Sequence, residues 1–401
     1  MTTHGTTRSR RFILKGLAAT GGAAAAGFVP ARFAIGQQAK IKLGMMLPYS
    51  GTYALLGKNI DEAFRLYINE HGGKLGGREI EWAQVDDQSD PPKGADNANK
   101  LITRDKVDFL IGTVHSGVQM AMLKVARDNE TFMIIPNAGL KEATGALCAP
   151  YIFRTSFSNW QPGFAMGKVA ADRGWKKAIT ITWDYAAGAE STGGFKDAFT
   201  KGGGSIMKAM AIPFPQVEFQ ALLTEIASLK PDVVFAFYAG GGAAKFVKDY
   251  VAAGLRTNIP LVGPGFLTDG VLEAQGDAAK GLETTLHYAD GLDNPADKRF
   301  RPAFKKASGR DADCYAVQGY DTAALLMAGV DAVKGDIKAR KEMIAAMEKT
   351  EIDSPRGKFH LSKSHNPVQD MYLRKVEGLE NKYVSVAVKA LADPDVGCSM
   401  A

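Results

Sequence analysis

Short turns of small, hydroxyl-bearing and aromatic residues follow six predicted strands, and they carry the side chains best suited to binding chemistry. Small residues let a ligand approach the backbone, and free N–H groups at helix N-termini attract anions. Ligands of open α/β sheets bind beyond the carboxyl ends of the strands, so the six turns together predict one shared site. Each turn alone is ordinary turn chemistry. The turns are residues 48–53, 112–117, 136–139, 184–188, 238–242 and 263–266.

No arrangement of residues predicts catalysis. His115 precedes Ser116, but neighbouring side chains rarely aim at each other, and neither a G-x-S-x-G turn nor an H-E-x-x-H helix occurs. Residues 240–242 are three glycines after a strand, without the G-x-G-x-x-G spacing of a dinucleotide site. We expect His115 to line the binding site and donate one hydrogen bond. The sequence therefore predicts no catalytic residue and no cofactor.

Histidine and carboxylate spacing predicts no metal site either. Asp86 and Asp87 lack further ligands at suitable spacing, so we interpret them as residues that cap a turn. His360 and His365 flank a lysine in a hairpin-like segment, and we expect that segment to be a solvated loop.

The chain has three cysteines, Cys148, Cys314 and Cys398, and their spacings make no metal site. An oxidising compartment permits a Cys148–Cys314 disulfide, although connectivity cannot be read from a sequence. The alternative is that the cysteines are unpaired and pack as small apolar residues.

Strand-like and helix-like segments alternate along the chain, and this alternation places the turns. Repeated strand–helix–strand units predict an α/β fold with parallel sheets covered by helices on both faces. The series restarts after a junction near residues 151–159, which indicates two similar doubly wound, Rossmann-like halves. The predicted strands of the two halves are 41–47, 79–85, 107–111, 132–135, 178–183, 205–212, 233–237 and 259–262, and the predicted helices are 56–68, 93–103, 118–127, 194–200, 219–229 and 243–253.

The last third of the chain follows a different pattern. A connecting strand at 282–288 precedes three predicted helices, and three predicted strands close the chain. We expect this third segment to return to the two existing halves. The helices are 299–307, 316–333 and 338–348, and the strands are 357–361, 371–376 and 383–388.

Length and charge restrict the class of protein. A chain of 401 residues is too long for one ordinary core and suits two domains. Residues 1–36 hold five basic and no acidic residues, so the remainder carries 44 basic against 43 acidic residues. A nearly neutral protein lacks the basic surface that nucleic acids require. We therefore expect no nucleic-acid partner.

The N-terminus is typical of an export signal. Arg10 and Arg11 precede a weakly apolar stretch that ends near Val29, and this arginine pair resembles the twin-arginine export motif. We expect residues 1–36 to be a signal peptide and the mature protein to be periplasmic. No later apolar run reaches the roughly 20 residues that span a bilayer. Because twin-arginine export often carries cofactor-loaded cargo, a periplasmic enzyme stays an alternative.

Seven short sequence motifs follow one another in order along the chain. They are Leu47-Pro48-Tyr49-Ser50-Gly51, Ile68-Asn69-Glu70-His71-Gly72-Gly73, Gly76-Gly77-Arg78-Glu79-Ile80, Asp86-Asp87-Gln88-Ser89, Gly112 to Gly117, Tyr151-Ile152-Phe153-Arg154-Thr155 and Gly319-Tyr320-Asp321. This ordered set resembles the branched-chain amino acid-type (Leu/Ile/Val-binding) periplasmic proteins, which have a type I binding-protein fold. The resemblance covers nearly the whole mature chain. It implies two lobes, three hinge crossings, closure on a ligand, docking on an ABC permease, and a monomer.

The resemblance also implies the domain boundaries. Lobe 1 is expected at residues 40–157 plus 289–350, and lobe 2 at residues 158–288 plus 351–391. Residues 392–401 are expected to be a C-terminal tail.

Carrying the family's binding residues onto this sequence gives a match and two departures. Family members hold the ligand carboxylate with a serine after the third strand, which Ser116 matches, and with groups after the fourth, here residues 137–139. Gly139 stands where amino-acid binders often have a threonine. In amino-acid binders, the turn after the last strand of lobe 2 has a sequence similar to Gly-Pro-Glu-Gly, and its glutamate pairs with the α-ammonium of the ligand. This chain has Gly263-Pro264-Gly265-Phe266 there.

Because a buried ammonium without a partner costs several kcal/mol, the missing glutamate predicts a carboxylate ligand without an α-amino group. Phe266 and nearby tyrosines favour an aromatic or aryl-alkenoic acid, since aromatic walls stack a ring. The expected ligand-binding residues are Tyr53, Leu56, His115, Ser116, Asn137, Ala138, Gly139, Tyr185, Ala187, Tyr238, Gly240, Gly265 and Phe266.

Other interpretations stay open from the sequence. Asp184 or Glu190 could supply the missing acid, and the ligand would then be a branched-chain amino acid or amide. The chain could also be a sensor subunit that presents a ligand to a membrane receptor, because such a subunit needs the same fold as a transport protein.

Overall fold

The computed structural model describes residues 39–401, and the first part of this range forms a five-stranded parallel sheet. The strand order is β2-β1-β3-β4-β5, so the chain moves to one side of β1 and then to the other. We call the part of the molecule built on this sheet lobe 1. Its strands are β1 (Ile41–Leu47), β2 (Ile80–Asp86), β3 (Phe109–Ile111), β4 (Phe132–Ile135) and β5 (Ile152–Arg154).

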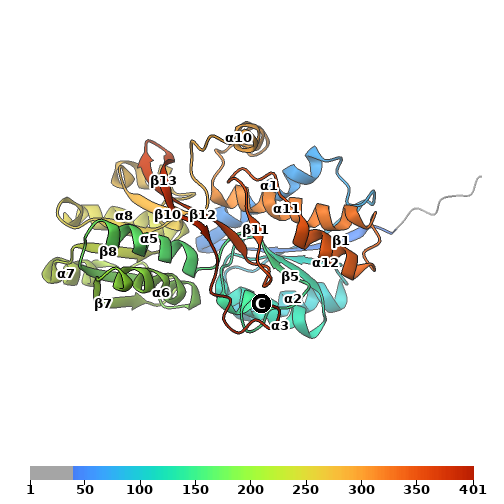
Figure 1. Cartoon of the computed structure of the whole chain (residues 1–401), viewed down its shortest axis with the longest axis horizontal. Coiled ribbons are helices and arrows are strands. Elements are labelled where there is room, and N and C mark those ends of the chain that lie inside the picture. Colours follow the sequence, from blue (N-terminus) through green and yellow to red (C-terminus); the bar gives the residue numbers. More distant parts are fainter. Residues whose placement is uncertain (1–38) are drawn as a thin grey trace, which may run out of the picture. The chain divides into compact units, whose positions relative to one another are not determined.

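Helices cover both faces of the lobe 1 sheet because its central strands are apolar on both sides. Met45 of β1 belongs to the core beneath α1 (Ala54–Glu70) and α11 (Cys314–Ala332). Met46, the next residue, belongs to the core beneath α2 (Pro91–Asn99) and α3 (Ser116–Asp128). Successive side chains of a strand point to opposite faces, so one short strand anchors two helical layers. In Figure 1, α1 and α11 lie side by side, and they pack against each other.

The second sheet, which defines lobe 2, has eight strands. Its parallel part has the order β10-β9-β8-β6-β7. Strand β12 pairs with β10 in antiparallel orientation, and β11 and β13 each pair with β12. The strands are β6 (Lys177–Trp183), β7 (Ser205–Ile212), β8 (Val233–Phe237), β9 (Leu261–Pro264), β10 (Glu283–Leu286), β11 (His360–Leu361), β12 (Pro367–Glu377) and β13 (Glu380–Leu391).

The same alternation builds the layers of lobe 2. Phe235 of β8 faces the core under α5 (Trp160–Asp172) and α6 (Ala186–Lys201). Ala236 faces the opposite core, under α7 (Gln220–Leu229) and α8 (Gly240–Ala252). Figure 1 shows α5 and α6 lying together against this sheet.

The remaining helices are short or belong to the return segment. Those of the return segment, with α11, are α10 (Pro295–Ser308) and α12 (Arg340–Lys349), and the short ones are α4 (Lys141–Thr144) and α9 (Leu272–Gln275). Single helical turns occur at η1 (Gly51–Tyr53), η3 (Leu255–Thr257), η4 (Gly265–Leu267) and η5 (Gly276–Ala279), and a π-helical turn, η2 (Lys100–Arg104), extends α2.

The chain passes between the two sheets three times. The first crossing, residues 155–159, joins β5 to α5, and the second, residues 287–294, joins β10 to α10. The third crossing, residues 350–359, joins α12 to β11. Both α10 and α11 contact α1, so the return segment packs on lobe 1 before the chain ends in lobe 2.

The predicted Cys148–Cys314 disulfide is wrong. Cys148 is bonded to Cys398, and Cys314 is a buried free thiol at the start of α11. The tail after β13 returns to lobe 1, where the Val396 carbonyl lies against Gly145 and places Cys398 within bonding reach of Cys148. The expected C-terminal tail is therefore fixed covalently to lobe 1.

The predicted solvated loop around His365 is also wrong. His365 is fully buried, and its ring stacks on Phe153 with 3.9 Å between centroids. Its ring nitrogens contact the Ile152 carbonyl at 2.9 Å and Glu348 at 3.0 Å. His360, by contrast, is exposed as expected. The predicted signal peptide, residues 1–36, lies outside the described residues. Among residues 39–401, no helix combines the length and apolar character needed to cross a bilayer.

Candidate functional site: a closed cavity between the lobes

The carboxyl ends of both sheets face a small cavity with a free volume of about 20 Å³. Ligand sites usually run from about 300 to 1,000 Å³, so the walls of this closed cavity must move apart to hold even one ring. Its walls are mostly aromatic and aliphatic, with two amides and three tyrosine hydroxyls. The lining residues are Tyr53, Leu56, Val114, Asn137, Phe157, Asn159, Tyr185, Ala187, Phe237, Ala239, Phe266 and Tyr315.

Four helices begin at this cavity. The N-cap residues are Tyr53 for α1, His115 for α3, Tyr185 for α6 and Ala239 for α8. A helix N-terminus presents unsatisfied N–H groups and a partial positive charge. Since two of these helices belong to each lobe, closure brings four positive ends toward one small volume. The site therefore favours a negative group on its ligand without an arginine or lysine in its lining.

Two tyrosines join the lobes across the cavity. The hydroxyls of Tyr53 in lobe 1 and Tyr185 in lobe 2 are hydrogen-bonded at 2.9 Å. Burial raises the pKa of Tyr53 well above its ordinary value and raises that of Tyr185 as well, so both hydroxyls keep their protons. The bond uses one donor, which leaves the other phenol proton available to a ligand oxygen.

His115 packs against this tyrosine pair. Its ring is stacked on Tyr185, with 4.5 Å between centroids and 10° between planes. The Nδ1 atom accepts hydrogen bonds from the backbone N–H groups of Gly117 (3.1 Å) and Val118 (3.4 Å), so the ring proton is on Nε2. Burial lowers the pKa of His115 to about 4, and the ring is neutral. The buried Nε2 has no partner within residues 39–401.

A second polar group links the two lobes at the cavity edge. Asn159 Nδ2 donates to Ser116 Oγ (3.2 Å) and to Glu190 Oε2 (2.8 Å). Glu190 also accepts from the backbone N–H of Lys141 at 3.2 Å. Burial raises the pKa of Glu190 to about 7. Gly139 is required beside Asn159, because a Cβ atom there would lie 2.5 Å from the Asn159 nitrogen.

Within the described part of the chain, residues 39–401, no carboxylate lines the cavity. Glu190 contacts the lining residue Asn159 from behind, and Asp184 is exposed. Gly265 does not offer room for the missing glutamate, because a Cβ atom there would lie 2.4 Å from Arg374 Nη2. Arg374 is buried and paired with Asp269. The position expected for the amino-acid binders' glutamate is thus a glycine packed on the Arg374–Asp269 ion pair, and neither member of this pair lines the cavity.

The predicted site residues fall into three groups. Tyr53, Leu56, Asn137, Tyr185, Ala187 and Phe266 line the cavity. His115, Ser116, Ala138 and Gly139 lie directly behind it, in the turns that hold Tyr185, Asn159 and Asn137.

The structure does not place the other three in the lining. Tyr238 is buried deeper in lobe 2, against Trp183 (5.0 Å between centroids) and Phe246 (4.7 Å). Gly240 meets the Thr52 carbonyl of lobe 1, where a Cβ atom would lie only 2.3 Å away. Gly265 packs on Arg374. Of these three residues, Gly240 is the one that lies at the closed interface of the lobes.

Sequence reasoning missed six lining residues. Val114 and Ala239 lie within turns that were recognised but were not chosen as binding residues, and Phe237 directly precedes one of these turns. Phe157 and Asn159 lie in the first crossing, which the sequence analysis interpreted only as the connection between the two halves and not as part of the binding site. Tyr315 comes from α11, after the last of the recognised turns, and no local pattern marks it.

The fold and site define a class of protein, and comparison with known families agrees. Residues 40–382 match the family described as periplasmic binding protein, so the chain belongs to that family. It is the solute-binding component of an ABC transporter, of the Leu/Ile/Val-binding-like kind, with the α/β type I fold expected from the sequence. Members of this class bind solutes without converting them, and the chain is not an enzyme.

Individual relatives narrow the comparison. The Leu/Ile/Val-binding protein homolog 6 of Brucella abortus is 33% identical over 345 residues, covering 84% of this chain and 87% of that protein. An ABC-transporter solute-binding protein from R. palustris, solved in complex with benzoate, is 53% identical with a TM-score of 0.88, covering 90% and 100% of the two chains. One from Rhodopseudomonas palustris BisB5, in complex with 3,4-dihydroxybenzoic acid, is 33% identical with a TM-score of 0.83, covering 88% and 99%.

Proposed function

We propose that this protein binds a small aromatic carboxylate, such as benzoate, in the cavity between its lobes and delivers it to an ABC permease. The observation that carries the proposal is the lining of the cavity. Aromatic rings from both lobes surround the cavity, four helices begin beside it, and no carboxylate of residues 39–401 lines it.

The charge of the lining separates this ligand class from amino acids. An α-ammonium group in this cavity would be buried without an anionic partner, at a cost of several kcal/mol. A lone carboxylate would instead receive hydrogen bonds from tyrosine hydroxyls and helix N-termini, which suits its charge. Phe157, Phe237 and Phe266 supply faces and edges for a ring. The benzoate and dihydroxybenzoate complexes of the two similar proteins support the same class.

A titration panel tests the proposed ligand. Purified mature protein, unfolded and refolded to remove co-purified ligand, is titrated with benzoate, 4-hydroxybenzoate, leucine and valine by calorimetry and thermal shift. We expect the aromatic acids to bind and raise the melting temperature, and leucine and valine to have no effect. Binding of leucine with no response to the aromatic acids would refute the proposal.

Export and domain motion complete the proposed function. We infer that residues 1–36 direct export by the twin-arginine route, and that the two rigid bodies are residues 40–157 plus 289–350 and residues 158–288 plus 351–391. The mature protein acts as a monomer that closes on its ligand before docking on the permease. Replacement of both Arg10 and Arg11 by lysine should leave the precursor in the cytoplasm, as seen by cell fractionation and immunoblotting. A precursor still processed and released by osmotic shock would exclude this route.

A further inference from the structure

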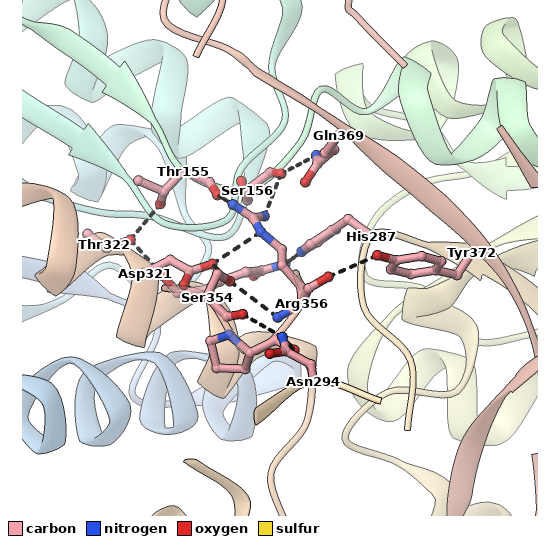
Figure 2. Close-up of polar contacts among 12 residues, drawn as sticks. Thr155, Ser156, His287, Asn294, Asp321, Thr322, Ser354, Arg356, Gln369 and Tyr372 are labelled. Carbon is pink, nitrogen blue, oxygen red and sulfur yellow. Dashed lines mark hydrogen bonds and ion pairs between the residues drawn. The ribbon is translucent and has the colours of Figure 1, made fainter. Parts of the chain in front are cut away.

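The motif Gly319-Tyr320-Asp321 lies on α11, the helix that packs on lobe 1. None of its three residues lines the cavity. Two of its residues fix the helix on α1. A Cβ atom on Gly319 would lie 2.1 Å from the Ile60 carbonyl, so only glycine allows this approach, and Tyr320 donates to Glu70 at 2.8 Å. The third residue, Asp321, points the other way and is fully buried. It contacts Ser354 and Arg356 of the third crossing (Figure 2).

A buried arginine from the third crossing is the centre of this region. Arg356 forms an ion pair with Asp321, with 3.1 Å between Nε and Oδ2, and both side chains are almost inaccessible to solvent. The guanidinium also donates to the backbone carbonyls of Ser156 (3.1 Å) and Thr155, in the first crossing. Figure 2 shows Arg356 between Asp321 on one side and these two carbonyls on the other. One side chain therefore joins two of the three crossings to α11.

The second crossing is tied to the same centre. Asn294 Nδ2 donates to the carbonyls of Ser354 (2.7 Å) and Pro355 (2.8 Å), which are in the third crossing. The Ser354 hydroxyl in turn donates to Asp321 at 2.8 Å. Tyr372 of β12 donates to the Arg356 carbonyl at 3.0 Å, which attaches lobe 2.

Other residues of α11 reach the crossings and the cavity. Thr322 is hydrogen-bonded to Thr155 of the first crossing at 2.7 Å. Gln318 contacts His287 of the second crossing at 3.3 Å and accepts from Asn137, which lines the cavity, at 2.7 Å. Consecutive turns of one helix thus contact all three crossings and one ligand-facing side chain.

The energetics favour a geometric role for the ion pair. A buried ion pair gains little net stability, because desolvation of both charges offsets their attraction. What such a pair does impose is a single arrangement, since each charged group requires its partners in place. Here the arrangement concerns the only three chain segments that link the two sheets within residues 39–401, apart from the disulfide-bonded tail.

We propose that Asp321 and Arg356 are positioning residues for ligand binding, which hold the three crossings as one pivot and thereby preorganise the closed cavity. Neither residue is part of the cavity lining. This proposal depends on the proposed function in one respect, the choice of benzoate as the test ligand. A protein whose pivot is loosened spends less time in the closed arrangement, and its apparent affinity falls by that fraction.

The main test uses a charge-balanced double variant, Asp321→Asn with Arg356→Gln, which leaves no unpaired buried charge. We expect its benzoate affinity to fall by about tenfold, mainly through faster dissociation in stopped-flow displacement. Ligand-free small-angle scattering should show a larger radius of gyration than the wild type. The matched control is Arg299→Gln with Asp353→Asn, an exposed ion pair joining α10 to the third crossing. It should bind benzoate and scatter as the wild type does.

Each outcome decides between the alternatives. If the double variant folds and keeps wild-type affinity and scattering, the pivot proposal is overturned, and the pair is merely structural. If the double variant does not fold, Arg356→Lys keeps the charge but cannot bond both carbonyls, and it must show the same two effects in smaller measure. If the wild type does not bind benzoate, the proposed ligand fails, while the ligand-free scattering of wild type and variant still decides the role of the pivot.

Discussion

At the scale of single residues, the site combines groups that bind with groups that hold the lobes together. The Tyr53–Tyr185 hydroxyl bond does both, because each ring lines the cavity and each belongs to a different lobe. The stacked His115 ring fixes the position of Tyr185 and at the same time caps α3. A change at one of these side chains should therefore alter ligand affinity through contact and through closure together.

Tyr185→Phe should weaken benzoate binding with little effect on folding. The substitution removes the hydroxyl that bonds Tyr53 and a donor for the ligand, and keeps the ring that packs on His115. Loss of one such hydrogen bond corresponds to about 1 kcal/mol, or roughly fivefold in affinity by calorimetry. Tyr250→Phe is the matched control, since its buried hydroxyl donates to the Ile259 carbonyl within lobe 2. Equal affinities for Tyr185→Phe and the wild type would remove this residue from the site.

Glu190→Gln should make stability less sensitive to pH. Burial raises the pKa of Glu190 from 4.5 to about 7, so the folded protein prefers the protonated acid more than the unfolded chain does. The stability that this group contributes is complete below its unfolded pKa of 4.5 and is lost as pH rises through about 7. Glutamine is neutral at every pH and still accepts from Asn159.

Thermal melts at several pH values check this expectation. The gain in stability of Glu190→Gln over the wild type should be on the order of 2 kcal/mol larger at about pH 8 than at about pH 5. Glu225→Gln, at an exposed ion pair with Lys208 on the surface of lobe 2, controls for the change in net charge. A pH-independent difference between Glu190→Gln and the wild type would show that folding does not raise the pKa of Glu190.

At the scale of elements, the tail after β13 adds a fourth connection between the lobes. The Cys148–Cys398 bond closes a loop of 250 residues, which includes all of lobe 2. Cys398→Ser should lower the free energy of unfolding by about 2–5 kcal/mol, because the unfolded chain is no longer constrained. Thermal melts of wild type with reductant should match those of the variant without it. A wild-type protein whose melting is insensitive to reductant would mean that the bond does not form.

Strand and helix prediction succeeded where periodicity was strong. The strands at 41–47 and 205–212 are confirmed with the expected bounds, since their apolar runs are bordered by turn residues. Helix α5, by contrast, was missed, because Pro162, Gly163 and Gly167 resemble helix breakers. The structure uses Pro162 in the first turn, where its missing N–H costs nothing. A Cβ atom on Gly163 would lie 2.0 Å from the Ser191 carbonyl, so the glycines allow α6 to pack closely.

The site was predictable to the extent that it follows the rule on strand ends. Tyr53, Asn137 and Tyr185 all follow strands, and the cavity contains them. Tyr315 could not be found in this way, because it reaches the cavity on a helix from the return segment. The pairing of Cys148 was predicted wrongly because it also depends on the path of the chain in three dimensions. Only the path of the tail places Cys398 beside Cys148.

At the scale of the whole molecule, the described residues are in a closed arrangement. The bond between Tyr53 and Tyr185, the contact of Gly240 with Thr52 and the bond from the Lys141 N–H to Glu190 all join the lobes around the cavity. A ligand could not enter while these contacts persist. Binding therefore requires an open state in which they are broken, and the ligand must stabilise the closed state over it.

Solution scattering can test this consequence on the wild-type protein. We expect the ligand-free form to have a larger radius of gyration than the arrangement described here, because the cross-lobe contacts are few and small. Saturation with benzoate should reduce the radius toward that of the closed structure, and the forward scattering should correspond to one chain in both states. Leucine serves as the comparison ligand and should leave the curve unchanged. The ligand-free protein could instead give a scattering curve that matches the closed structure and does not change when benzoate binds. That result would mean that the ligand enters by a route other than separation of the lobes.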